Sequence, residues 1–267
     1  MDVEGFRTIV YDYYNTNKRS FPWRNEVTPY RVFISEVMLQ QTQAGGRTIE
    51  KFNVFLEKFP TFEALATAPL SDILKMWQGL GYNRRALMLK RAAEIIVREY
   101  DGNLPSTVEE LDALPGIGHA TACSISAFAF NAPVVFIETN IRSVFIHHFF
   151  PGRDDVSDKE LLPIVASTLD TENAREWYSA LMDYGASLKK SVGNESRRSK
   201  HYAKQSKFEG SDRQIRGEIL RLLSAQGNVE YEGLRLYNAN DVRMYTVIEG
   251  LIKEGLIVRE GSSIRIT

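Results

Sequence analysis

A proline–glycine turn between two helical runs constrains the fold of this chain more than any other feature. The stretch LDALPGIGHATA covers Leu111–Ala122, and the helix that precedes the turn would end at Leu114. Gly116 and Gly118 permit a tight turn and a close approach of the backbone to another group. The small residues that follow would start a second helix, whose first amides point outward and can bind a phosphate. The same pattern also fits a turn that only joins two core helices.

Helical periodicity dominates the first two hundred residues. Apolar residues recur at intervals of three and four, while proline and glycine separate the runs. Strand-like alternation is scarce before residue 210, and the small apolar run Ala120–Phe130 is typical of a buried helix. This part of the chain is therefore predicted to be all-α. The spacing predicts helices over Phe6–Tyr14, Tyr30–Gln41, Ile49–Phe59, Leu70–Trp77, Arg84–Tyr100 and Val108–Ala113.

Composition and cysteine content exclude several classes of protein. The 267 residues are 43% hydrophobic and 25% charged, which is ordinary for a globular protein. No apolar run reaches the ~20 residues of a membrane span, and the acidic N-terminus lacks the order of a signal peptide. We therefore expect a cytoplasmic protein without membrane contact. Cys123 is the only cysteine, so cysteine alone cannot build an internal disulfide, a zinc site or an iron–sulfur site.

The net charge of −1 hides a local excess of basic residues. Between residues 187 and 216 nine lysines and arginines stand against three acidic residues. Serine is frequent and aliphatic residues are rare in residues 187–211, so this segment is predicted to be a surface loop or linker. A local basic segment can contact phosphates even when the whole chain is neutral. The candidate contacts are Lys189, Lys190, Arg197, Arg198 and Lys200; a flexible, solvated linker is the alternative.

The pattern changes after residue 210. RQIRGEILRLLSAQG and DVRMYTVIEGLIKEG have the spacing of amphipathic helices, and LIVREGSSIRIT alternates around Gly261 and Ser262 like a small hairpin. Two helices and a two-stranded tip predict a winged-helix module over residues 211–267. Some winged-helix modules bind DNA and others bind protein partners, so both roles stay open.

Four motifs together resemble a known family. FPWRNEVTPYRVFISEVMLQQTQ at 21–43 and WQGLGYNRRALMLKRAA at 77–93 are similar to the MutY branch of the helix-hairpin-helix DNA glycosylases. The turn LPGIG and the acid of FIETN follow in the family's order, so the resemblance covers about residues 5–190. It implies an all-helical, two-lobed fold with DNA in the cleft. The target nucleotide would be flipped out of the duplex and its N-glycosidic bond cut.

The resemblance and the change of pattern together predict the domain organisation. A helix-hairpin-helix glycosylase domain would span residues 1–207, followed by the winged-helix module at 211–267. Within the first domain, a six-helix lobe would cover about 25–134, and a second lobe would form from 1–24 and 135–207. The fold class is thus all-α with a small α+β module at the C-terminus.

Excision of adenine requires two carboxyl groups with different tasks. Adenine is a poor leaving group unless it is protonated, so an acid must reach the base, and a carboxylate must serve the sugar. The resemblance implies that Glu36 is the acid. On a helix that continues through Gln41, Glu36 and Gln40 would lie one turn apart on one stripe. Without the resemblance, the same stripe is typical of a solvated helix face.

The resemblance also implies residues that hold the distorted duplex. Gln40, with Gln41 beside it, would insert from the minor groove, and Tyr82 would intercalate beside the orphaned base. A core or turn aromatic is the alternative for Tyr82. Arg24 and Arg85 are candidates for contacts to phosphate or for shaping the site.

Glu138 stands where the glycosylases have an aspartate. The family pattern is D-G-N or D-T-N, whereas this chain reads Glu138-Thr139-Asn140 and continues with a basic Arg142. The carboxylate here is one methylene longer, and catalysis is sensitive to displacements of about an ångström. Glu138 could do the aspartate's work, with Asn140 in support. It could also mark a branch with another substrate or a chain that binds without cutting, and it could cap the helix beginning near Thr139.

Three further departures shape the expected chemistry. The position of the lysine that serves as Schiff-base nucleophile in endonuclease III-like members is Ala120, so a monofunctional enzyme is predicted. The region where relatives hold a [4Fe–4S] cluster contains no cysteine, so no such cofactor is expected. The tail is too short for the domain with which MutY proteins read 8-oxoguanine. Gly116 and Gly118 would present amides to a phosphate, with a monovalent cation held by nearby carbonyls, and His119 could touch the phosphate.

These inferences lead to one favoured function and several rivals. The chain would excise a mispaired base, adenine above all, from double-stranded DNA, acting as a nucleoid-associated monomer. A glycosylase for thymine or uracil opposite guanine, or for deaminated or alkylated purines, is the nearest alternative. A non-catalytic lesion-binding protein and a transcription regulator acting through the winged helix are the others. Activity dependent on Glu36 would distinguish an enzyme from both of these.

Overall fold

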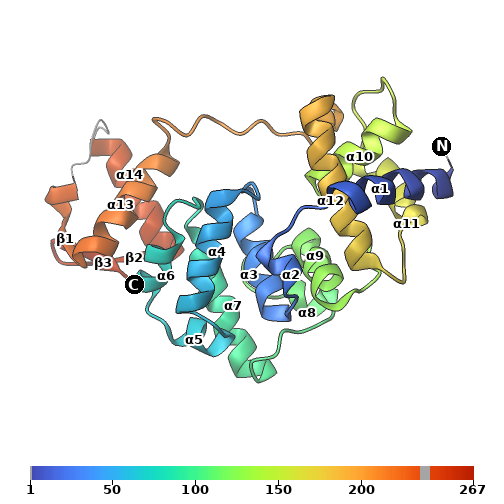
Figure 1. Ribbon diagram of the computed structural model, residues 1–267. Coiled ribbons are helices and arrows are strands. Elements are labelled where there is room, and N and C mark those ends of the chain that lie inside the picture. The colour runs from blue at the N-terminus through green and yellow to red at the C-terminus, as the bar shows by residue number, and fades with distance from the viewer. Residues whose placement is uncertain (1, 235–240) are drawn as a thin grey trace. The chain divides into compact units, whose positions relative to one another are not determined.

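The computed structural model describes residues 2–234 and 241–267, and they form two compact units (Figure 1). The first unit comprises residues 1–36, 106–113 and 117–204. The second unit comprises residues 37–105, 114–116 and 205–267. Helix α3 (Pro29–Leu39) is shared, because the division falls between Glu36 and Val37.

The first unit is all-helical. Its elements are α1 (Val3–Asn17), α2 (Pro22–Asn25), the start of α3, α8 (Val108–Asp112), α9 (His119–Phe130), α10 (Thr139–Phe149), α11 (Asp158–Thr168), α12 (Ala174–Ser191) and the 3₁₀ turn η1 (Glu195–Arg198). Side chains at the helix starts satisfy amides that lack a partner within the helix. Asp2 accepts from the Gly5 amide at 2.7 Å, and Ser157 with Glu160 forms a capping box on α11.

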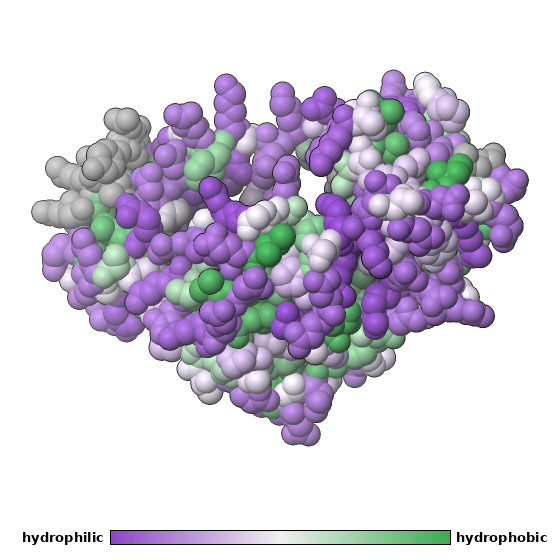
Figure 2. All heavy atoms as spheres, viewed as in Figure 1, coloured by the Kyte–Doolittle hydropathy of each residue, from purple (hydrophilic) through white to green (hydrophobic). Residues whose placement is uncertain are grey.

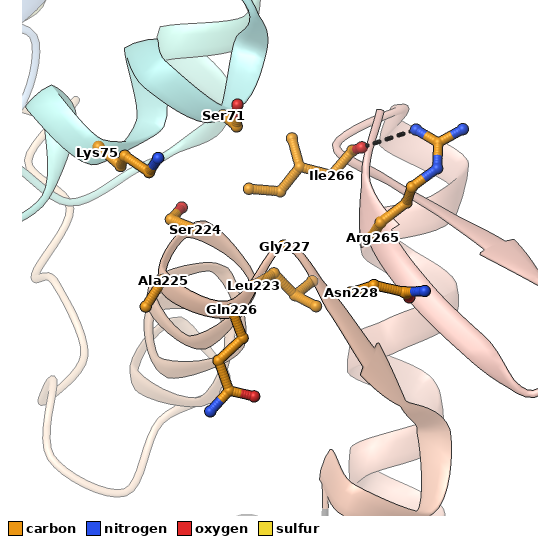
Figure 3. Close-up of a pocket in the computed structure, with 10 residues that line it drawn as sticks. All are labelled: Ser71, Lys75, Leu223, Ser224, Ala225, Gln226, Gly227, Asn228, Arg265 and Ile266. Carbon is orange, nitrogen blue, oxygen red and sulfur yellow. Dashed lines mark hydrogen bonds between the residues drawn. The ribbon is translucent and has the colours of Figure 1, made fainter.

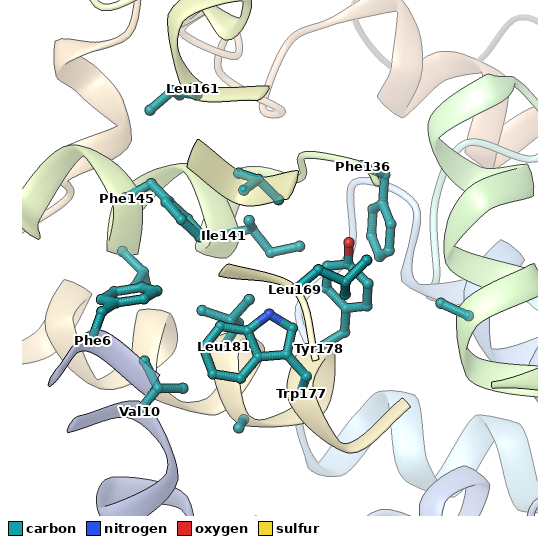
Figure 4. Close-up of a cluster of buried hydrophobic side chains, with 14 of the residues drawn as sticks. Phe6, Val10, Phe136, Ile141, Phe145, Leu161, Leu169, Trp177, Tyr178 and Leu181 are labelled. Atoms are coloured by element: carbon teal, nitrogen blue, oxygen red, sulfur yellow. The ribbon is translucent and has the colours of Figure 1, made fainter. Parts of the chain in front are cut away.

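Aromatic side chains fill the core of the first unit, where α1 and α10 pack on α12. Figure 4 shows Phe6 and Val10 of α1 facing Trp177 of α12, and the rings of Phe6 and Trp177 lie 5.9 Å apart, edge to face. Trp177 and Tyr178 are both fully buried. Burial of side chains of this size contributes about 1.5–3 kcal/mol each, so this cluster holds α12 firmly in place.

The second unit holds the remaining helices of the predicted glycosylase domain. They are the end of α3, α4 (Gly46–Lys58), α5 (Phe62–Thr67), α6 (Leu70–Trp77) and α7 (Arg84–Tyr100). The apolar spacing that predicted α4, α6 and α7 reflects their buried faces. The ring centres of Phe55 on α4 and Trp77 on α6 lie 6.1 Å apart, edge to face. The Trp77 indole also donates to the carbonyl of Gly81 at 3.0 Å, which fixes the turn before α7.

The C-terminal residues of the second unit form the two predicted helices and the predicted hairpin, but the sheet has three strands instead of two, because β1 (Asn228–Glu230) pairs with β3 (Ser263–Ile266). The order of these elements is α13 (Asp212–Gln226), β1, the 3₁₀ turn η2 (Tyr231–Leu234), α14 (Asp241–Glu254), β2 (Ile257–Glu260) and β3. The sheet is antiparallel with strand order β1-β3-β2, and Ile257 pairs with Ile266 across the hairpin. Gly261 has a φ of 64° at the hairpin turn, a left-handed backbone conformation that favours glycine. Helix α13 packs on α6.

A hollow of about 540 Å³ opens beside the contact of α6 with α13 (Figure 3). Ser71 and Lys75 line one side, and the residues from Leu223 to Asn228 and the end of β3 line the other. None of the predicted site residues lines it.

Two expectations about element bounds need correction. Helix α3 ends at Leu39 rather than Gln41, because the Arg85 guanidinium takes the carbonyls that a further turn would use. Residues 187–191, predicted as loop, are the last turn of α12, where Lys189 and Lys190 complement the helix dipole. The two compact units group residues 205–267 with 37–105, whereas the predicted domain bounds separate them; those bounds remain a prediction about independently folding parts.

The visible surface is mostly hydrophilic, with hydrophobic residues in small separate patches (Figure 2). Among the described helices, none combines the length and the apolarity that crossing a membrane requires.

Candidate active site

Glu36 and Ser124 form the centre of the candidate site in the first unit. Glu36 lies on α3 and Ser124 on α9, and the Ser124 hydroxyl donates a hydrogen bond to Oε2 of Glu36. Burial raises the pKa of the Glu36 carboxyl to about 7. The hydrogen bond from Ser124 acts in the opposite direction, the negative charge of Glu138 raises the pKa further, and the positive charge of Arg24 lowers it. A carboxyl of this kind can hold or release a proton near neutral pH.

Glu138 is the N-cap of α10. Its Oε1 accepts the amide of Asn140 at 2.6 Å and the amide of Ile141 at 2.9 Å, while the Asn140 side chain approaches Oε2 at 3.4 Å. Burial nevertheless raises the pKa of this carboxyl, outweighing the hydrogen bonds that favour its charged form. The capping role considered from the sequence is therefore present, and it fixes one carboxylate oxygen while the Asn140 amide lies near the other.

Arg24 is held by a buried aspartate on α12. Both oxygens of Asp183 lie 3.0 Å from Nη1 of Arg24, and Asp183 also accepts the backbone amide and Nε of Arg19, each at 2.8 Å. The guanidiniums of Arg24 and Arg19 lie 5.1 and 5.0 Å from the centre of the Phe21 ring. Asp183 is 1% exposed, so this arrangement compensates a buried charge and fixes the cation that acts on Glu36.

Helix α12 also supports the N-terminus of α10. A Cβ atom on Gly185 would lie 2.5 Å from the carbonyl oxygen of Asn140 and 2.8 Å from its Cβ. The side-chain amide of Asn140 points to the sulfur of Met182 at 3.7 Å. One helix thus positions both Arg24, through Asp183, and the segment that carries Glu138 and Asn140.

Arg85, predicted to contact DNA, is bonded to protein acceptors in the second unit. Its Nη1 donates to the carbonyls of Val37, Met38 and Gln40 at 2.6–2.9 Å, and its Nη2 reaches Leu80 and Gly81 at 3.1 Å. Burial lowers the pKa of this guanidinium to about 10. Arg85 therefore ties the end of α3 to the turn before α7.

Tyr82, Gln40 and Gln41 lie in turns of the second unit. Tyr82 and Gln41 have backbone φ angles of 49° and 55°, in the left-handed region that is uncommon for residues other than glycine. The side chain of Gln40 donates to the carbonyl of Gly116 at 3.3 Å instead of extending a helical stripe. The hydroxyl of Tyr82 accepts from Arg213 of α13 at 2.9 Å, and the Arg213 guanidinium lies 5.7 Å from the ring centre.

The two glycines of the hairpin turn have different surroundings. Gly116 has a φ of 79°, and a Cβ there would lie 2.6 Å from Cβ of Met88, so both conformation and space require glycine. Gly118 is the N-cap of α9, and no heavy atom of the described residues, its chain neighbours apart, lies within 4 Å of the position of its Cβ. His119 begins α9 with its side chain 74% exposed, 4.0 Å from Asp112.

The basic segment divides into outward and inward residues. Lys189, Lys190 and Arg197 are exposed. Arg198 turns inward: Nη1 donates to Glu195 at 2.5 Å, and Nη2 donates to the carbonyls of Phe150 and Arg153. We call this set, Arg198 with Glu195, Phe150 and Arg153, the Arg198 clasp. Beside it, backbone hydrogen bonds from Val156 to Arg198 and from Lys200 to Val156 join the segment to the loop after α10.

Sequence reasoning missed Ser124, Asp183 and the inward role of Arg198. Asp183 had a usable signal, because it is an acidic residue among the apolar positions of α12, and a buried charge of that kind needs a cation. Ser124 had almost none, because small polar residues are common in buried helices.

Comparison with known proteins places the chain in a family. The profile of the HhH-GPD superfamily of base excision DNA repair proteins matches residues 34–164. The adenine DNA glycosylase of Mycolicibacterium smegmatis is 32% identical over 234 residues, covering 79% of this chain and 78% of that protein. The chain therefore belongs to the helix-hairpin-helix base excision repair superfamily, in its MutY-like branch.

Other relatives extend this likeness. The adenine DNA glycosylase of Buchnera aphidicola (Baizongia pistaciae) is 33% identical over 182 residues, and the chain spans about half of its length, 52%. A thermostable thymine-DNA glycosylase structure is 27% identical with a TM-score of 0.61, covering 69% of this chain and 86% of that one. An endonuclease III–DNA complex, 18% identical with a TM-score of 0.58, covers 68% and 85% and shares the fold.

The residues of this chain do not fit an iron–sulfur cluster. Its single cysteine, Cys123, is buried in α9, whereas a [4Fe–4S] cluster is held by four cysteine thiolates. In the part of the chain that the structure describes, no three histidine, cysteine, aspartate or glutamate side chains are grouped to hold a metal ion.

Proposed function

We propose that this chain is a monofunctional DNA glycosylase that hydrolyses the N-glycosidic bond of a mispaired adenine. The observation that carries the proposal is Glu36, whose pKa of about 7 suits a general acid and whose neighbours are Ser124, Arg24 and Glu138. An acid and a second carboxylate within electrostatic reach are what excision of a purine requires.

The reaction would proceed by proton transfer and hydrolysis. Glu36 donates its proton to a ring nitrogen of the flipped base, and the bond to C1′ breaks with its electron pair remaining on the base. The carboxylate of Glu138 stabilises the positive charge that develops on the sugar. Water then adds to C1′ and releases its proton to a carboxylate, which leaves an abasic sugar. Ala120 offers no amine, so no Schiff base forms and the strand stays intact.

Several observations support double-stranded DNA with a mismatch as the substrate. The relatives named above include adenine DNA glycosylases, and one solved complex contains DNA. Gly116, Gly118 and His119 of the hairpin and the exposed Lys189, Lys190 and Arg197 would hold phosphates, and Gln40, Gln41 and Tyr82 would hold the opened duplex. The chain would act as a monomer, without an iron–sulfur cluster, in the cytoplasm at the nucleoid.

A second candidate substrate is thymine opposite guanine. The thermostable thymine-DNA glycosylase favours it at 27% identity. A neutral acid at Glu36 matters more for adenine than for thymine, because adenine leaves poorly without protonation, so we favour adenine.

Single-turnover base release tests the proposal. The full chain is mixed in excess with duplexes carrying adenine opposite 8-oxoguanine or guanine, and thymine or uracil opposite guanine. Glu36→Gln and Glu138→Gln are assayed beside it. Release of adenine that both variants abolish supports the proposal. Tight binding without release from any duplex would overturn it in favour of a lesion-binding protein.

A further inference from the structure

Two serines on α9 have the same type and burial but different partners. Ser124 is 5% exposed and Ser126 is 2% exposed. The Ser126 hydroxyl donates to the backbone carbonyl of Ser106 at 3.2 Å, which is a structural contact with the segment before α8. The Ser124 hydroxyl donates to Oε2 of Glu36. Residues two apart on a helix face different sides, so only one of the two hydroxyls serves the candidate acid.

The hydrogen bond from Ser124 makes the two carboxyl oxygens of Glu36 inequivalent, because it reaches Oε2. An oxygen that accepts a hydrogen bond at its lone pair is the less suitable oxygen to carry the acidic proton. With Oε2 engaged by Ser124, Oε1 is the better site for the proton of the neutral acid. When that proton leaves, Glu36 becomes a carboxylate, and a hydrogen bond to a charged acceptor is stronger than one to a neutral acceptor.

We propose that Ser124 is a positioning residue for base excision: its hydroxyl holds Oε2 of Glu36, presents the proton on Oε1, and stabilises the carboxylate that remains. In the step concerned, the Oε1–H bond breaks, an N–H bond forms on the base, and the electron pair stays on Glu36. This inference rests on the glycosylase function proposed above. The charged groups that act on Glu36 from the neighbouring segments are Glu138 at the start of α10 and Arg24 on α2, and Ser124 adds a neutral donor from α9.

The test compares Ser124→Ala with Ser126→Ala across pH. Single-turnover excision is measured between about pH 5.5 and 9 with the duplex that the wild-type chain cuts. Loss of one hydrogen bond to a charged group corresponds to a rate loss of roughly 10- to 100-fold, expected for Ser124→Ala. Its alkaline limb should move to higher pH, because the charged form of Glu36 loses a stabilising donor. Ser126→Ala should lower stability without moving the limb.

Conservative variants at position 124 separate the role of the hydroxyl from that of side-chain volume. Ser124→Thr retains the hydroxyl and should restore the wild-type pH profile, with Ser126→Thr as the control for the added methyl group. Should Ser124→Ala fail to fold, Ser124→Cys retains the volume with a weaker donor and should give a partial shift. A Ser124 variant without the hydroxyl that matches Ser126→Ala in rate and pH profile overturns this inference alone. A wild-type chain that releases no base overturns the proposed function and this inference with it.

Discussion

Gly185 lies directly against the backbone of Asn140, where a methyl group would come within 2.5 Å of the carbonyl oxygen of Asn140. The contact joins the middle of α12 to the first turn of α10, which Glu138 caps. Backbone cannot move aside as a flexible side chain does, so the absence of a side chain at position 185 sets the position of the capping carboxylate.

Gly185→Ala should therefore impair excision, although alanine in a helix is normally more favourable than glycine. The added methyl pushes the start of α10 away, and overpacking of this kind lowers the free energy of unfolding by about 1–3 kcal/mol. Displacement of Glu138 should slow single-turnover excision by roughly tenfold or more. Gly217→Ala on α13 is the matched control, because no described residue outside its own stretch of helix backbone lies within 4 Å of its Cβ position, and it should be neutral or slightly stabilising. Equal behaviour of the two variants would contradict the positional role of Gly185.

Glu36→Gln should abolish excision and stabilise the protein at alkaline pH. The folded-state pKa of about 7 lies above the ordinary value of 4.5, so the folded chain binds more protons between these values. Stability from Glu36 is thus fully present below about pH 4.5 and is lost as the pH rises through 7. The loss is at most about 3 kcal/mol, and glutamine removes it. Thermal or denaturant unfolding at pH 5 and pH 8 should show the variant gaining far more on the wild type at pH 8 than at pH 5.

The two substitutions Glu138→Asp and Glu138→Gln separate charge from capping. Aspartate is a favourable N-cap and keeps the negative charge, so the fold should persist and excision should stay within about tenfold of the wild-type rate. Glutamine can still accept from the amides of Asn140 and Ile141 but cannot stabilise a positive sugar, so excision should fall by roughly 100-fold or more. Excision rates and unfolding curves, measured together, check both. Equal rates for the two variants would mean that Glu138 only caps α10.

Asp183→Ala should be among the most destabilising single changes in the first unit. It leaves Arg19 and Arg24 without the buried carboxylate that compensates them, which typically lowers the free energy of unfolding by about 3–5 kcal/mol. Asp154, 79% exposed and 3.6 Å from Arg198, provides the control, because surface pairs of that kind contribute at most about 1 kcal/mol. Chemical denaturation of Asp183→Ala and Asp154→Ala measures both losses in the free energy of unfolding. A small loss for Asp183→Ala would show that the two arginines find other partners.

Salt dependence should distinguish the outward from the inward basic residues. Replacing Lys189 and Lys190 by serine should flatten the slope of log affinity against log salt by up to about 2, if both contact phosphates. Arg198→Ser should leave the slope unchanged and lower the unfolding temperature, because its donors are bonded to Glu195, Phe150 and Arg153. Fluorescence anisotropy with a labelled duplex at several salt concentrations measures the slope. A change of slope for Arg198→Ser would contradict the inward role.

Local patterns predicted many elements of the fold, but no residue range was predicted for α5, α11, α12 or β1. The spacing of apolar residues identified α4, α6 and α7, and the alternation around Gly261 identified the hairpin of β2 and β3. The motifs identified Glu36 and Glu138 as candidates, but the two residues lie 102 positions apart in the chain. Their electrostatic coupling depends on the packing of α3, α9 and α10 and has no signature in either local segment.

The same reason explains what was missed. Ser124 is one small polar residue among others on α9, and only the position of Glu36 makes its hydroxyl significant. Arg85 and Arg198 have the composition of phosphate contacts, yet both donate to backbone carbonyls that tertiary structure brings to them. The end of α3 at Leu39 likewise depends on Arg85, which is 46 residues further along the chain.

The Arg198 clasp is built entirely from groups that the chain itself supplies. In this chain the segment after α12 is tied to the loop after α10 by a guanidinium, a carboxylate and two carbonyl groups. Iron starvation or an oxidising burst can deprive a protein of a metal cluster, but neither removes these groups. The tie between these two segments therefore consists of protein groups that fold with the chain itself.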